Sequence, residues 1–165
     1  LYQLILTDQS LREFSSLYHV QPPLRSAADR DGLREAVKSG VIQAISSHHQ
    51  PHERDAKLAP FGATEPGISS VELLLPLAMT LVDDGLLDLP TLLARLSSGP
   101  AAALRLPAGE LKVGGAADLV LFDPQASTVA GEQWFSRGEN CPFIGHCLPG
   151  AVRYTFVDGH LCHEG

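Results

Sequence analysis

The chain has 165 residues, of which 44% are apolar, and its formal net charge is −7. This size and composition support a folded domain with a buried core and exclude a disordered tail. The negative charge and the twelve scattered Lys and Arg residues argue against nucleic acid as the main partner, because phosphate binding needs a basic face.

Two further features concern the cellular location. No apolar run reaches the ~18 residues that a membrane-spanning helix needs, and the first residues do not resemble a signal peptide. The three cysteines, Cys141, Cys147 and Cys162, form no CxxC pair, which is typical of a reducing compartment. We therefore expect a cytoplasmic protein that does not contact a membrane.

The first part of the chain alternates short apolar stretches with helical patterns. Residues 4–6 predict the end of a strand. Ser26 and Asp29 predict a capping box at the start of a helix, and Gly40 predicts its end. Residues 41–45 (VIQAI) predict a strand that is buried on both faces. A polar turn with three histidines follows, and then a loop that runs through Gly67.

Three more helical patterns precede residue 106. Ser69 or Ser70 is expected to cap the first, in which Pro76 requires either a kink or a later start. Pro90 is expected as the first residue of the next helix, and a short Ala-rich helix follows Pro100.

The pattern changes to β structure after residue 106. Strands are predicted at residues 110–113, 118–123 and 152–157, with Pro124 closing the second and Asp158-Gly159 forming a hairpin turn into the last strand. The pattern predicts an α/β fold, with residues 1–106 as the C-terminal part of a TIM-type (β/α) barrel and residues 107–165 as a small all-β unit appended to it. A complete barrel takes ~250 residues, so the chain holds part of one, or some smaller α/β fold.

The turn at residues 48–52 (HHQPH) is the main candidate for a functional site. It follows the carboxyl end of a predicted strand, where barrels place functional side chains, and imidazole is the commonest metal ligand. However, Pro51 interrupts the helical spacing that would direct His48 and His52 at one ion, and no supporting carboxylate is obvious nearby. A metal site and a hydrogen-bonded turn both remain open. Arg25, in a Pro-Pro-Leu-Arg stretch, either clamps a carboxylate or belongs to a stiff loop.

A series of motifs resembles a known family. In chain order they are LTD (6–8), PPLR (22–25), HHQPH (48–52), PFG (60–62), VELLLPL (71–77), ADLVLFD (117–123) and ENCPFIG (139–145). This order is similar to the C-terminal part of a dihydroorotase of the long bacterial type, in the amidohydrolase superfamily. The resemblance extends over nearly the whole chain. It implies a (β/α) barrel with a metal centre and a small β-sandwich built from both chain ends, of which residues 107–165 would be a portion.

The resemblance also implies roles for individual positions. Active members interconvert carbamoyl aspartate and dihydroorotate with zinc-held water, and an aspartate that opens the histidine turn binds metal and moves a proton. His48 occupies that position here. Tyr2 and Gln3 occupy the place of paired histidines that supply a metal ligand, and Gln21 replaces an asparagine that contacts substrate. His52 still matches a contact to the substrate carboxylate.

These replacements predict a catalytically inactive, dihydroorotase-like subunit of pyrimidine biosynthesis. Its catalytic position, His48, would be vestigial; Gln3 and His48 would be former metal-ligand positions; and His52 and Gln21 would be vestigial substrate positions. We expect no cofactor, and we expect a homo-oligomer or hetero-oligomer in which the chain supports assembly of the aspartate transcarbamoylase catalytic chain. The alternative is an active zinc-dependent dihydroorotase or related cyclic amidase with a rearranged metal site, in which His48 acts as ligand or base.

Overall fold

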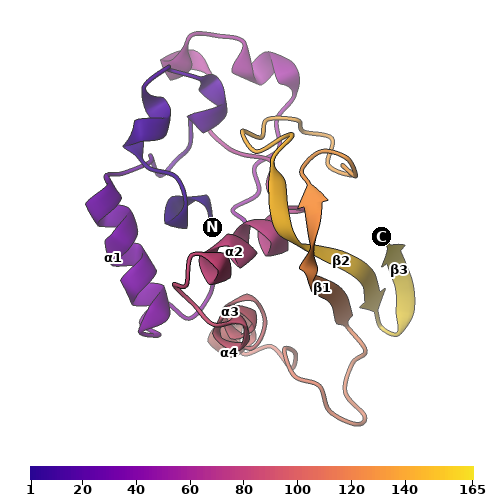
Figure 1. Ribbon diagram of the computed structural model, residues 1–165. Helices are drawn as coiled ribbons and strands as arrows, with labels where there is room; N and C mark the ends of the chain where they lie inside the picture. Colours follow the sequence, from indigo (N-terminus) through magenta and orange to yellow (C-terminus); the bar gives the residue numbers. More distant parts are fainter.

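The computed structural model describes residues 1–165 (Figure 1). Four α-helices precede three β-strands, and short 3-10 helices occupy much of the remaining N-terminal half. The helices are α1 (Ala27–Lys38), α2 (Leu74–Asp83), α3 (Leu89–Leu96) and α4 (Ser98–Leu104); the strands are β1 (Leu119–Val129), β2 (Cys147–Val157) and β3 (His160–Glu164). The 3-10 helices are Tyr2–Leu4, Asp8–Leu11, Ser16–Tyr18, Arg54–Lys57 and Phe61–Ala63. In Figure 1, α2 lies between α1 on one side and the sheet on the other.

Local sequence signals set the limits of α1 as predicted. The Ser26 hydroxyl accepts a hydrogen bond of 3.2 Å from the Asp29 backbone N–H, and the Asp29 carboxylate accepts one of 3.2 Å from the Ser26 backbone N–H. This reciprocal pair is a capping box. At the other end, Gly40 has a φ of +85°, the left-handed conformation that ends helices and that glycine adopts without steric cost.

The next two helices begin differently from the prediction in detail. Helix α2 begins at Leu74, so Pro76 lies in its first turn, where the missing N–H leaves no hydrogen bond unmade. The later start is therefore the correct alternative, and neither Ser69 nor Ser70 caps this helix. Asp88 caps α3 by accepting a hydrogen bond of 2.8 Å from the Thr91 N–H, which makes Pro90 the second residue of the helix and not the first.

The three strands form one antiparallel sheet in the order β1-β2-β3. The turn between β2 and β3 consists of Asp158 (φ +49°) and Gly159 (φ +78°), which confirms the predicted hairpin. Pro124 does not close β1, because the pairing with β2 resumes at Ser127 after an irregularity. Such irregularities leave residues unpaired, so a proline there removes no ladder hydrogen bond.

Three predicted strands are absent, and the prediction was wrong for them. Leu4 is the last residue of the first 3-10 helix, and residues 5 and 6 follow it without forming a strand. Residues 41–45 and 110–113 are irregular. A strand exists only through hydrogen bonds to a neighbour, and these 165 residues supply no neighbour at those places. Val41, for example, is 79% exposed. The second half contains a single sheet, so these residues alone do not form a two-layered sandwich.

Helix α2 is shared by the two hydrophobic clusters. On one side Leu77 packs with Tyr2, Ile68 and Phe143; on the other Leu81 packs with residues of α1 and α3 such as Val37 and Leu92. Strand β2 also packs against α2. The first cluster therefore joins the N-terminal turns to the segment before β2, which positions the histidine turn. No helix in this structure has the length and hydropathy of a membrane-spanning segment.

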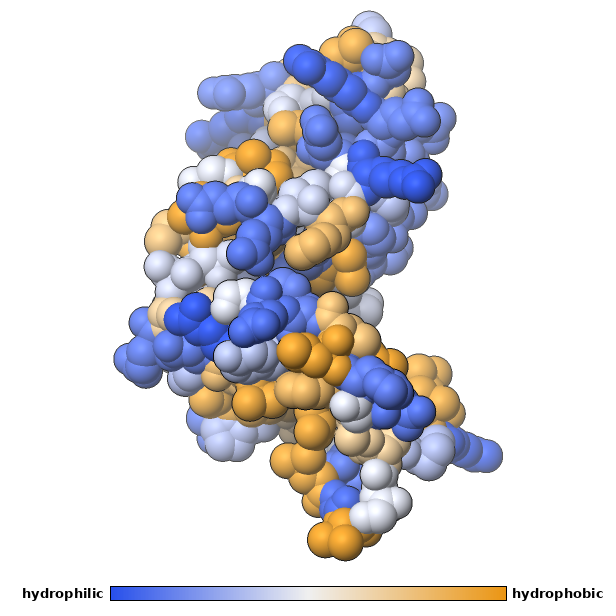
Figure 2. All heavy atoms as spheres, turned by 90° about the vertical axis from the view of Figure 1, so that its right-hand side faces the viewer, coloured by the Kyte–Doolittle hydropathy of each residue, from blue (hydrophilic) through white to orange (hydrophobic).

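Apolar side chains gather on the lower part of the molecule in Figure 2, whereas its upper part is mostly hydrophilic. The last residue of α4, Leu104, is exposed, and so are three apolar residues of the connection from α4 to β1, which are Leu106, Leu111 and Val113.

Candidate functional site

The histidine turn follows an irregular segment and lies against the loop that leads to α2. The Gln50 N–H donates a hydrogen bond of 2.9 Å to the carbonyl of Ile68, and His49 and Ile68 form an isolated parallel bridge. Ile68 is fully buried. This single bridge holds the turn at the edge of the first hydrophobic cluster.

Asn140, in the ENCPFIG motif, fastens the turn from the other side. Its side-chain N–H groups donate to the carbonyls of Gln50 (2.9 Å) and Gly67 (3.0 Å), and its side-chain oxygen accepts a hydrogen bond of 2.7 Å from the His52 N–H. The residue is 3% exposed, so these bonds satisfy polar groups that water does not reach. Asn140 is not among the site residues predicted from the sequence, although its motif was part of the family resemblance.

Two glycines leave the space that this turn occupies. A Cβ atom on Gly138 would lie 2.6 Å from Pro51 Cβ and 2.7 Å from the His52 backbone nitrogen. A Cβ atom on Gly67 would lie 2.5 Å from Gln50 Cβ. These distances are shorter than real Cβ contacts, so the turn packs directly against glycine backbone on two sides.

His49 ties the turn to the residues before α2. Its Nδ1 accepts hydrogen bonds from the backbone N–H groups of Ser70 (3.0 Å) and Val71 (3.1 Å). A neutral imidazole that accepts at Nδ1 carries its proton on Nε2, which lies 3.5 Å from the Ser136 hydroxyl. His49 is therefore a structural residue with neither nitrogen free for a cation.

The carboxylate of Glu72 holds the loop at residues 135–136. Glu72 Oε1 accepts hydrogen bonds from the N–H groups of Phe135 (2.8 Å) and Ser136 (2.5 Å), while the buried Oε2 has no partner.

His52, predicted as a substrate contact, donates from Nε2 to the Pro66 carbonyl at 3.0 Å.

His48 forms a hydrogen bond with Tyr2, which occupies another position where the family's residue is replaced. The Tyr2 hydroxyl lies 2.6 Å from His48 Nδ1. Tyr2 is buried, and this burial raises the pKa of its phenol. His48 itself is exposed and has a left-handed backbone with a φ of +51°, a conformation that Asn, Asp and His adopt more readily than other side chains.

The other predicted positions lie in the first 25 residues, with Gln3 in the 3-10 helix Tyr2–Leu4 and Gln21 in the loop before α1. The Gln3 side-chain amide donates to the carbonyl of Pro22 at 2.8 Å, next to Gln21. The exposed Gln21 lines a small hollow of about 310 Å³ together with Phe61. The Arg25 guanidinium is exposed and lies 3.8 Å from the Asp29 carboxylate on α1.

The side chains of the predicted site positions, Gln3, Gln21, His48 and His52, do not fit a zinc site made from this chain. No group of three or more His, Cys, Asp or Glu side chains is placed to hold a metal ion. At the positions where the resemblance implies ligands, the Gln3 amide nitrogen and His48 Nδ1 are already hydrogen-bonded to the protein. Structural zinc sites have four protein ligands and catalytic ones three, and the ligands face one point.

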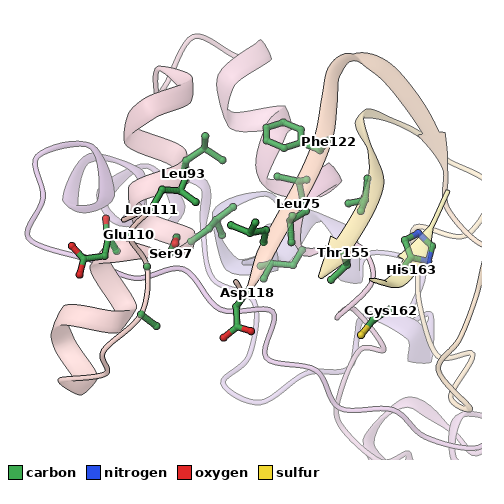
Figure 3. Close-up of a pocket in the computed structure, with 18 of the residues that line it drawn as sticks. Leu75, Leu93, Ser97, Glu110, Leu111, Asp118, Phe122, Thr155, Cys162 and His163 are labelled. Atoms are coloured by element: carbon green, nitrogen blue, oxygen red, sulfur yellow. The ribbon is translucent and has the colours of Figure 1, made fainter. Parts of the chain in front are cut away.

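A larger hollow lies elsewhere in the molecule. It has a volume of about 1130 Å³ and lies between α2, α3, the connection to β1 and the sheet (Figure 3). Leu75, Leu93, Leu111 and Phe122 line it, and none of Gln3, Gln21, His48 or His52 does. Its lining is mainly apolar, and exposed apolar surface of this kind suits packing against another protein segment.

Comparison with known proteins finds clear relatives. The model of the amidohydrolase family matches residues 10–162. The chain is 93% identical over 163 residues to a dihydroorotase-like protein of Pseudomonas putida, and 80% identical over 165 residues to a dihydroorotase-like protein of Pseudomonas aeruginosa. These matches cover 99% and 100% of this chain. A dihydroorotase of Geotalea daltonii is 38% identical over 160 residues, or 96% of the chain. The chain spans 38%, 39% and 38% of these three relatives.

Solved structures agree with these matches. A D-hydantoinase from Thermus sp. superposes with a TM-score of 0.89 at 25% identity, over 99% of this chain and 38% of that one. An L-hydantoinase from Arthrobacter aurescens gives a TM-score of 0.83 at 27% identity, over 98% and 38%. The matches confirm the amidohydrolase family and the similarity to dihydroorotases that the motif order predicts.

Proposed function

Since this chain belongs to the amidohydrolase family, we propose that it is part of a dihydroorotase-like subunit that has lost dihydroorotase activity and supports an aspartate transcarbamoylase assembly. The observation that carries the proposal is the hydrogen bond between Tyr2 and His48, the residues at two replaced positions. At the place of the paired histidines and at the place of the proton-transferring carboxylate, this chain has side chains, those of Tyr2 and His48, that hydrogen-bond to each other.

The chemical consequence follows from the charge of the lost group. A carboxylate is anionic, so it attracts a cation and takes up and releases a proton during hydrolysis. A neutral imidazole supplies no negative charge, and His48 Nδ1 is already engaged. Gln3 has an amide, which binds zinc poorly compared with imidazole, and its nitrogen donates to Pro22.

The contacts that hold the histidine turn are present although the catalytic positions are replaced, and this favours a structural role. Asn140, Gly67 and Gly138 still hold the histidine turn through three hydrogen bonds and two close backbone contacts. A subunit that serves as a structural partner needs its fold but not its metal. We propose the aspartate transcarbamoylase catalytic chain as that partner, on the basis of the family resemblance.

The activity part of the proposal is tested on the complete gene product. We expect no interconversion of carbamoyl aspartate and dihydroorotate and substoichiometric zinc, with the dihydroorotase of Geotalea daltonii assayed in parallel as the positive control. Turnover at the rate of that enzyme, together with one or more zinc ions per chain, would refute the proposal. That result would establish the alternative, an active cyclic amidase with a rearranged metal site.

The partner part is tested separately by co-expression with a tagged aspartate transcarbamoylase chain. We expect the two chains to co-elute in size exclusion at a defined ratio, and the transcarbamoylase alone to give smaller or less stable particles. Separate elution at micromolar concentrations of both chains would contradict the proposed assembly role and leave the activity result unaffected.

A further inference from the structure

The hydrogen bond between Tyr2 and His48 also bears on which nitrogen of His48 carries the proton. The Tyr2 side chain is 1% exposed, and its hydroxyl has no hydrogen-bond partner other than His48 Nδ1, at 2.6 Å. A hydroxyl has a single proton to donate, and buried donors in folded proteins almost always have an acceptor. If Nδ1 were the donor, the phenolic proton would have nothing to bond. The arrangement that satisfies both residues has Tyr2 donating to Nδ1.

A neutral imidazole has one N–H group and one lone pair, so a ring that accepts at Nδ1 has its proton on Nε2. We infer that Tyr2 is a positioning residue that locks His48 in the Nε2–H tautomer, so that this position presents a hydrogen-bond donor and not a lone pair. The inference rests on the proposed function, because it explains why a histidine at this position does not replace the metal ligand that the proposed function treats as lost.

The polarity of this pair is opposite to that of a metal-binding histidine. Histidine ligands usually donate from one ring nitrogen to a carbonyl or carboxylate, and this bond leaves the lone pair of the other nitrogen for the metal. A protonated phenol on Nδ1 reverses the arrangement. Burial raises the pKa of Tyr2, so the phenol keeps its proton at neutral pH. The atoms that suit the exposed side of His48 are acceptor oxygens, such as those of a carboxylate, a carbonyl or water.

The test reads the tautomer directly and does not depend on catalysis. The complete gene product is labelled with ¹⁵N-histidine, and long-range ¹H–¹⁵N spectra are recorded at pH 8. His48→Gln identifies the His48 signals by their loss. We expect the Nε2–H pattern for His48 in the parent protein. In Tyr2→Phe, which keeps the buried ring and removes the hydroxyl, we expect the ratio of Nε2–H to Nδ1–H forms to fall by about fivefold.

Tyr18→Phe is the matched control, because the partly exposed Tyr18 hydroxyl makes no hydrogen bond and its removal should leave the His48 signals unchanged. An Nδ1–H pattern in the parent protein, or an unchanged ratio in Tyr2→Phe, would overturn the inference. A locked tautomer in a protein that nevertheless turns over dihydroorotate would overturn only the proposed function. An inactive protein with the Nδ1–H pattern would overturn only the tautomer lock.

Discussion

Asn140 and His52 are 88 positions apart in the sequence, yet the Asn140 side-chain oxygen accepts a hydrogen bond of 2.7 Å from the His52 backbone N–H. The same amide donates to two carbonyls on the other side, so one buried side chain joins the histidine turn, the loop before α2 and the C-terminal motif. The geometry of the turn therefore depends on a residue that lies outside it.

Asn140→Asp should destabilise the protein through these bonds. A carboxylate has the same shape but no N–H groups, so the carbonyls of Gln50 and Gly67 would lose their donor while a charge became buried. We expect the free energy of unfolding in denaturant to fall by about 3 kcal/mol.

Gln125→Glu is the matched control for Asn140→Asp, because the Gln125 side chain is exposed and makes no hydrogen bond. We expect its effect to be within about 0.5 kcal/mol. Equal unfolding midpoints for the two variants would show that the Asn140 amide does not hold the turn.

Gly138→Ala should also destabilise the protein, for a steric reason. The added methyl group would lie within 2.7 Å of Pro51 Cβ and the His52 nitrogen, and backbone atoms cannot move away without distorting the turn. Overpacking of this kind typically costs about 1–3 kcal/mol. Gly62→Ala is the control, because no atom lies within 4 Å of the position that its methyl group would occupy, and its φ is not positive. A thermal unfolding midpoint of Gly138→Ala that matches that of Gly62→Ala would contradict the close packing.

The N-terminus of α1 should contribute a pH-dependent stability. Hydrogen bonds from the Ser26 hydroxyl and backbone N–H lower the pKa of Asp29. A carboxyl group with a lower pKa in the folded state stabilises the fold above its unfolded-state pKa of ~3.9, and this contribution is lost as the pH falls through the folded-state pKa.

Ser26→Ala tests this pH dependence by removing the cap. We expect the free energy of unfolding to decrease by about 1 kcal/mol at pH 7 and the difference from the parent protein to shrink below pH 4. Ser127→Ala, at an exposed serine without a side-chain hydrogen bond, should have no effect at either pH. A pH-independent loss in Ser26→Ala would exclude the proposed role of the Asp29 carboxylate.

Cys141 should resist alkylation until the protein unfolds. Its thiol is 2% exposed, and burial raises the pKa to about 11, so at pH 8 it is both inaccessible and protonated. Cys147 and Cys162 are exposed and serve as internal comparisons. We expect iodoacetamide at pH 8 to modify these two in the native protein and Cys141 only in denaturant, as measured by peptide mass mapping. Modification of all three at similar rates would contradict the burial of Cys141.

Some features of this protein were determined by the sequence alone. The capping box of Ser26 and Asp29, the end of α1 near Gly40 and the hairpin at Asp158-Gly159 all depend on residues that are close in the chain, so local patterns predicted them correctly. The order of the motifs likewise identified the amidohydrolase family, because that order reflects ancestry and not local structure.

Only the tertiary structure decided which strands exist and what the histidines bond to. Residues 41–45 have the composition of a buried strand but no neighbouring strand in these 165 residues, and a strand requires hydrogen bonds to another chain segment. The partner of His48 is Tyr2, 46 positions away. No local pattern identifies such a partner, because the protonation and role of an imidazole depend on groups that only folding brings within hydrogen-bonding distance.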